Sequence, residues 1–189
     1  MLIIPLLTAA LLVPVVVVFV PVRVASNHWL WEWAQALGYL AVGSAALLFV
    51  YRHRPAVFPR FRSVYFTYLH RDLGMMTCAL VIAHLGVLLF AEPLLIEHLT
   101  LTAPWHMLSG IAATVLLVPL GIGALPAVRQ RLWGGRRRFR RWHLRLSLVF
   151  AALLLHHIVG SGGYINHASQ VLVLSAMAIA IAVAFARRH

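Results

Sequence analysis

Six long runs of apolar residues, separated by short polar links, dominate this sequence. They cover approximately residues 2–21, 34–51, 66–90, 104–124, 142–160 and 168–186. A helix that crosses a bilayer needs roughly 20 apolar residues, so each run is long enough for one crossing. The pattern predicts an all-α membrane protein, a bundle of six transmembrane helices. We expect a single transmembrane domain over residues 1–189.

The first run has the length of a transmembrane helix rather than that of a signal peptide. A signal peptide carries a basic segment ahead of a shorter apolar stretch. No basic residue precedes the apolar run over residues 2–21. We therefore expect this run to be the first transmembrane helix.

Composition excludes a soluble domain. Hydrophobic residues make up 62% of the chain, charged residues only 11%, and the mean hydropathy is +0.90. The net charge of +12 comes from arginines that lie mostly between the apolar runs. This distribution is typical of cytoplasmic loops and anionic lipid contacts, so we expect no nucleic-acid partner. The single cysteine, Cys78, excludes an internal disulfide, and no set of cysteines can hold an iron–sulfur cluster.

The charges of the links predict the orientation. Basic residues fill the second link, the fourth link and the C-terminus, whereas the third link holds Glu92 and Glu97 and no basic residue. Basic loops stay in the cytoplasm, so six crossings put both termini there. We expect a multi-pass protein of the bacterial inner membrane.

Histidines at two depths of two apolar runs are the candidate functional residues. His70 and His84 are 14 positions apart, and His143 and His156 are 13 apart, with His157 next. Ionisable residues inside a membrane are costly and indicate function, and imidazole is a common axial ligand of haem iron. In the predicted topology the two helices run in the same direction, and the two levels are about 21 Å apart. We expect two haems, one between His70 and His143 and one between His84 and His156.

Helix geometry does not decide whether His156 or His157 is the periplasmic-side ligand of the fifth run. At about 100° per residue, His84 points within roughly 40° of the direction of His70, which is 14 positions earlier. His156 points about 140° away from His143, which is 13 positions earlier. An ideal helix therefore favours His157 over His156, unless a π-bulge lies between the two levels. A simpler role for an intramembrane histidine is a helix contact or a proton relay, but four at paired depths favour haem.

These residues resemble a known family. The stretch HRDLG at residues 70–74, followed by His84, resembles the HRxxG…H signature of the ferric reductase-like transmembrane superfamily. That superfamily includes ferric reductases, the membrane part of NADPH oxidases and the haem subunit of periplasmic methionine sulfoxide reductase. His143 with His156 resembles the family's second histidine pair. The resemblance implies a six-helix bundle with two b-type haems and electron transfer from inside to outside. It also implies His156, rather than His157, as the ligand.

The resemblance covers approximately residues 34–165 and has one departure. Members usually carry a cytoplasmic flavin and nicotinamide domain, and this sequence contains no such segment and no GxGxxG motif. We therefore expect electrons from a quinol, a bound flavin or a partner flavoprotein, and delivery to a periplasmic acceptor. The chain would be the electron-transfer subunit of an oxidoreductase. The alternatives are a haem-bearing anchor subunit of a larger redox complex and, with less support, a histidine-relay transporter.

Two arginines lie beside the histidines of the cytoplasmic level. Arg71 follows His70, and Arg145 lies two positions after His143. Arginine pairs bidentately with carboxylates such as haem propionates, so both are candidate cofactor contacts. Long arginine side chains also extend to lipid phosphates, and the sequence favours neither role.

Overall fold

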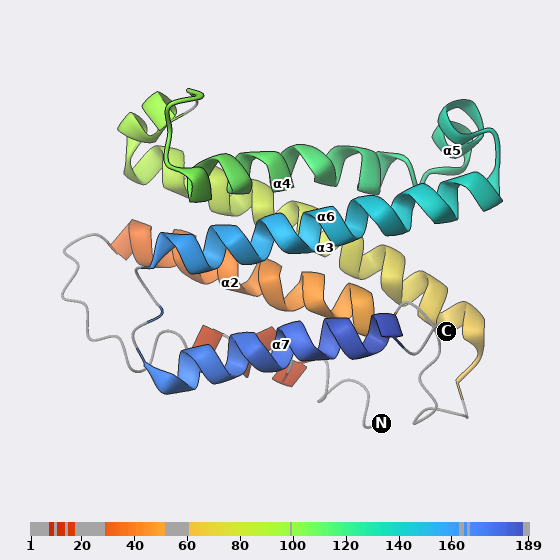
Figure 1. Ribbon diagram of the computed structural model, residues 1–189, viewed down its shortest axis with the longest axis horizontal. Helices are drawn as coiled ribbons and strands as arrows, with labels where there is room; N and C mark the ends of the chain where they lie inside the picture. Colours follow the sequence, from red (N-terminus) through yellow and green to blue (C-terminus); the bar gives the residue numbers. More distant parts are fainter. Residues whose placement is uncertain are drawn as a thin grey trace. The chain divides into compact units, whose positions relative to one another are not determined.

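The regular structure of the chain is helical wherever it is described (Figure 1). The computed structural model describes residues 8–9, 11–13, 15–17, 29–51, 61–98, 100–162, 165 and 167–186. Its elements are α2 (Trp29–Val50), α3 (Ser63–Ala91), the 3₁₀ turn η1 (Pro93–His98), α4 (Trp105–Ile122), α5 (Pro126–Trp133), α6 (Arg136–Ser161) and α7 (Ala168–Ala186). Helices α2, α3, α4 and α6 are long and apolar enough to cross a membrane. The prediction of an all-α, multi-pass membrane protein is confirmed.

Four of the six predicted crossings thus correspond to helices with the length and composition of a membrane span. The first apolar run lies largely outside the described residues. Helix α7 is apolar, but its apolar stretch Ala168–Val183 is shorter than the other four. The six-helix count, the cytoplasmic termini and the single domain stay predictions.

Two helices begin five or more positions before their apolar runs. Helix α2 begins at Trp29, and α6 begins at Arg136, six positions before the run at 142–160. Hydrophobicity marks only the part of a helix that suits the hydrocarbon, whereas arginine is itself a good helix former. The separate helix α5 was not predicted, although proline at its start and glycine after its end are the usual signals. Gly134 and Gly135, with φ of 61° and 139°, separate α5 from α6.

The chain divides into two compact units, one of residues 1–92 and 163–189 and one of residues 93–162. In the first unit, α2 packs against both α3 and α7. Its buried residues are mostly small, among them Ala34, Ala41, Ser44 and Ala45. Small residues let helix backbones approach closely in a membrane, where packing and hydrogen bonds hold helices together.

Apolar packing and one polar contact join α2 to α3. Leu47, Tyr51, Phe66 and Leu73 form the buried cluster at one end of the pair, and the rings of Tyr51 and Phe66 stack with centroids 6.0 Å apart. Nearer the middle, a pair of buried hydroxyls links the two helices. The Ser44 hydroxyl lies 2.9 Å from Thr77 Oγ1, and both hydroxyls reach the carbonyl of Leu73.

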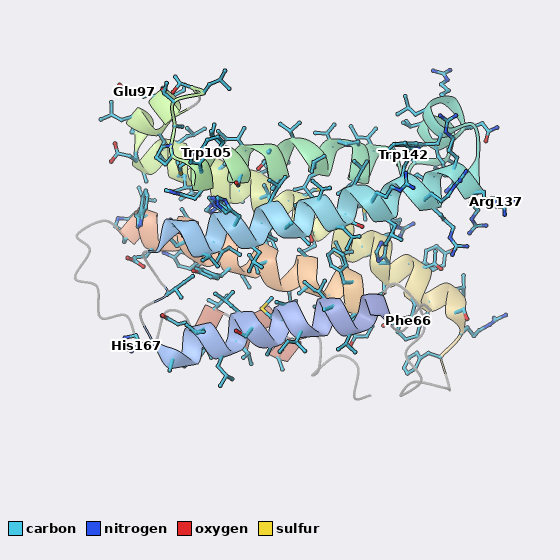
Figure 2. The ribbon with its side chains drawn as sticks, viewed as in Figure 1. Phe66, Glu97, Trp105, Arg137, Trp142 and His167 are labelled. Atoms are coloured by element: carbon cyan, nitrogen blue, oxygen red, sulfur yellow. The ribbon has the colours of Figure 1, made fainter. Side chains whose placement is uncertain are left out.

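In the second unit, α4 packs against α6, and α5 folds back onto the start of α6. The Trp133 ring lies against Trp142, with centroids 6.1 Å apart. Figure 2 shows Trp105 and Trp142 at opposite ends of the α4–α6 pair, with Arg137 at the Trp142 end and Glu97 at the Trp105 end. Aromatic residues at both ends of such a pair are typical of helices that meet two membrane surfaces.

The buried hydroxyl pair provides a test of the α2–α3 contact. We expect Ser44→Ala to lower the free energy of unfolding by about 0.6 kcal/mol, the usual value of a hydrogen bond between membrane helices. Unfolding by SDS titration from a mild detergent measures this. Thr67→Ala is the matched control, because the exposed Thr67 hydroxyl donates to the carbonyl of Ser63 in the same helix. Equal stability of the two variants would contradict this role for Ser44.

Candidate functional site

Both histidines of α3 direct one ring nitrogen at the backbone of α2. Nδ1 of His70 lies 3.1 Å from the carbonyl oxygen of Leu48, and Nδ1 of His84 lies 2.6 Å from that of Ala34. A carbonyl can only accept, so each Nδ1 carries a proton and donates it. In a neutral imidazole the lone pair is then on Nε2.

The spacing of the two histidines matches the spacing of the two carbonyls. His70 and His84 are 14 positions apart along α3, and Leu48 and Ala34 are 14 apart along α2 in the opposite order. The two helices are therefore antiparallel and keep one register over both levels, about 21 Å apart. Thr77, midway between the histidines, faces α2 as well through its bond to Ser44.

The two accepting carbonyls are open to a ring for different reasons. Leu48 is among the last residues of α2, where carbonyls lack a partner within the helix, so His70 satisfies one of them. Ala34 lies inside α2, but the residue four positions later is Gly38. A Cβ at Gly38 would lie 3.0 Å from both Cε1 and Nδ1 of His84, so the missing side chain makes room for the imidazole.

The second unit contains the same arrangement at one level. Nδ1 of His157, on α6, lies 2.8 Å from the carbonyl oxygen of His106 on α4. The residue four positions after His106 is Gly110, and a Cβ there would lie 2.7 Å from Nδ1 of His157 and 2.9 Å from its Cε1. His157 therefore donates through Nδ1, as His84 does.

His156 uses a side chain of α4 rather than its backbone. Its Nδ1 lies 2.8 Å from the hydroxyl oxygen of Ser109. Helix α6 is α-helical from Arg136 to Ser161, with no π turn, so the bulge that would align His156 with His143 does not occur. His156 is exposed, and His157 is half-buried.

The inner histidine of α6 and its neighbouring arginine lie among aromatic rings. The His143 ring lies 5.0 Å from the ring of Phe139, centroid to centroid. The guanidinium of Arg145 lies over the ring of Trp142, 5.4 Å from its centroid. Arg145 is thus held at the end of α6 that carries the other arginines.

Arg71 makes contacts within its own helix. Its guanidinium pairs with the carboxylate of Asp72 at 2.9 Å and lies 5.2 Å from the ring centroid of Tyr68. Both charged side chains are more than half exposed. In this state the arginine is oriented by Asp72, and whether it also contacts a cofactor stays a prediction.

The sequence indicated the histidines but not the groups that accept their hydrogen bonds. The carbonyls of Ala34, Leu48 and His106 and the hydroxyl of Ser109 carry no motif of their own. The only signal was a glycine inside an apolar run, at Gly38 and at Gly110. Within the described ranges, no three His, Cys, Asp or Glu side chains come together as a metal site.

The geometry defines a class of protein: a membrane-embedded helical protein with ordered imidazoles inside its apolar helices. The family model described as ferric reductase like transmembrane component matches residues 37–155. The chain belongs to this ferric reductase-like family, and the resemblance seen in the sequence is confirmed. Membership indicates transmembrane electron transfer, and domains of this family generally bind haem. No curated protein and no solved structure matches the chain.

The glycine beside His157 provides a test of this packing. We expect Gly110→Ala to cost about 1–3 kcal/mol of unfolding free energy, because the new methyl group must displace the imidazole. Chemical or SDS unfolding in detergent measures it. Gly86→Ala is the control, since nothing lies within 4 Å of a Cβ at that position. A Gly110→Ala variant as stable as the control would show that the ring moves aside without cost.

Proposed function

We propose that this chain is a di-haem cytochrome b that carries electrons across the membrane. The proposed ligands are His70 with His143 for the cytoplasmic-side haem and His84 with His156 for the periplasmic-side haem, as inferred from the sequence. The observation that supports this most is the state of the imidazoles. Those of His70 and His84 donate from Nδ1, so the lone pair of each neutral ring, the group that binds a metal, is on Nε2.

The two histidines of α3 have the arrangement that a haem ligand needs. Metal-binding histidines almost always donate the other ring N–H to a carbonyl or carboxylate, which fixes the ring and raises the basicity of the ligand nitrogen. His70 and His84 do this through the carbonyls of Leu48 and Ala34. When bound by these imidazoles, haem iron would supply reversible one-electron chemistry.

The remaining residues serve electron transfer by holding the imidazoles still and by excluding water. The α2 carbonyls fix both rings of α3, so a change of oxidation state requires little movement of the ligands. Apolar residues lie beside the His70 level, since Leu73 and Phe66, about one turn to either side of it along α3, are buried in the α2–α3 contact. A low-polarity setting of this kind controls the reduction potential of a bound redox centre.

The proposed direction of electron flow is from the cytoplasm to a periplasmic acceptor. The arginines of α5 and of the first turns of α6 lie at one end of the second unit. Positive surfaces steer and orient acidic partners, so this end suits a redox partner protein, a flavin phosphate or a quinol site near the lipid surface. The proposed location is the bacterial inner membrane.

The ligand assignment is tested by haem content. We expect purified protein to hold two b haems per chain by the pyridine haemochrome assay. His84→Ala should lose one haem and keep the other, because the two levels use separate ligands. His167→Ala is the control, since its side chain is exposed at the start of α7.

Two results would contradict the proposal. Protein that contains no haem after expression with added haem precursor would exclude the function itself. Full haem content in His84→Ala would leave the function intact but exclude this ligand.

A further inference from the structure

His156 and His157 are adjacent on α6, both bond to α4, and use different kinds of acceptor. His157 donates to the carbonyl of His106, 2.8 Å away, and its ring fills the space over Gly110. His156 contacts the hydroxyl of Ser109, 2.8 Å away. Two neighbouring imidazoles therefore sit in two different surroundings.

The direction of the Ser109 bond follows from the second contact of that hydroxyl. Ser109 Oγ donates to the carbonyl oxygen of Trp105 at 2.9 Å. A serine hydroxyl has one proton and two lone pairs, so toward His156 it can only accept. Nδ1 of His156 therefore carries a proton, and a neutral ring keeps its lone pair on Nε2. The chain of bonds runs from His156 through Ser109 to the backbone of α4.

Exposure distinguishes the two rings. His157 is half-buried against α4. Its contact with α4 explains how a polar ring is tolerated at this position. His156 is exposed on a helix long and apolar enough to cross a membrane. A polar ring that faces lipid is costly, so the open nitrogen of His156 calls for an occupant other than lipid.

We infer that Ser109 is a positioning residue for a haem ligand: its hydroxyl fixes the ring of His156 through Nδ1, which leaves Nε2 as the atom that would bind iron, while His157 holds α6 against α4. This inference rests on the proposed function and extends it to a residue outside the ligand set. Ser109 does not touch the metal, and it acts through His156. Like the carbonyl of Ala34 for His84, it accepts the hydrogen bond from Nδ1 and so orients the ring.

The effect of Ser109 on the haem follows from the acceptor strength. An acceptor at Nδ1–H increases electron donation from Nε2 to the iron and so favours the oxidised form. Without the hydroxyl, the ligand is a weaker donor and its ring is free to rotate. The haem should bind less tightly, and its midpoint potential should rise.

The test uses the full-length holoprotein in detergent or nanodiscs. Two readouts are measured: the rate of haem transfer to excess apomyoglobin, and the midpoint potential of each haem in a redox titration. We expect Ser109→Ala to release one of the two haems about tenfold faster, in line with the loss of other outer-shell partners of metal ligands. The midpoint of that haem alone should shift upward.

Three further variants separate a positioning role from a structural one. Ser109→Thr keeps the hydroxyl and should restore both readouts. Ser109→Cys has similar size and a weaker acceptor, and should shift the potential in the same direction even if Ser109→Ala folds poorly. Thr114→Ala is the matched control, because the Thr114 hydroxyl makes the same kind of bond within α4, to the carbonyl of Gly110, and contacts no histidine in the described part of the chain.

His157→Gln completes the experiment. An amide can still donate to the carbonyl of His106, so we expect both haems to be retained. Loss of a haem in His157→Gln, together with unchanged potentials in Ser109→Ala, would overturn the inference and make His157 the ligand. Wild-type protein without haem would instead exclude the proposed function, so the two failures are distinguishable.

Discussion

The structure depends on one constraint: a polar imidazole inside an apolar helix must find an acceptor for its N–H. Water is not available at that depth, so the acceptor has to come from the neighbouring helix. In the α2–α3 pair that acceptor is the helix backbone, which a ring can reach only if the two helices approach closely. The alanines and serine of α2, and Gly38 above all, make that approach possible. Helix packing and the chemistry of the site are therefore set by the same small residues.

The same constraint explains the difference between the histidines. The carbonyl of Leu48 is accessible because α2 ends there. The carbonyls of Ala34 and His106 are accessible because a glycine follows each of them one turn later. His156 has no such carbonyl and uses the hydroxyl of Ser109. Hydroxyls bond less rigidly than backbone carbonyls, because they rotate. All four imidazoles thus donate from Nδ1 to an oxygen, but the ring of His156 is held less rigidly than the other three.

The sequence predicted the parts of this protein that repeat a simple pattern. Apolar runs predicted five of the helices, α2, α3, α4, α6 and α7. Histidine spacing predicted His70 and His84 on one face of α3, and the contacts of both rings with α2 bear this out. The sequence did not predict the early start of α6, because the arginine-rich residues 136–141 resemble a loop when only hydrophobicity is considered. The acceptors were missed because a backbone carbonyl has no residue identity. Gly38 and Gly110 could have indicated the carbonyls of Ala34 and His106, but a glycine in a membrane helix has several other uses.

The bond between His84 and Ala34 has a consequence for a helix that carries no proposed ligand. The carbonyl of Ala34 accepts the regular bond of the helix and the imidazole N–H together, so a metal bound at the proposed ligand His84 would polarise this peptide group. A change of charge at the metal would alter the polarisation of that peptide group and, through it, of the turn around Gly38. The vibrational frequency of this one carbonyl would then record the oxidation state of the centre. In the haem-loaded protein, α2 would therefore respond to electron transfer at the proposed His84 level.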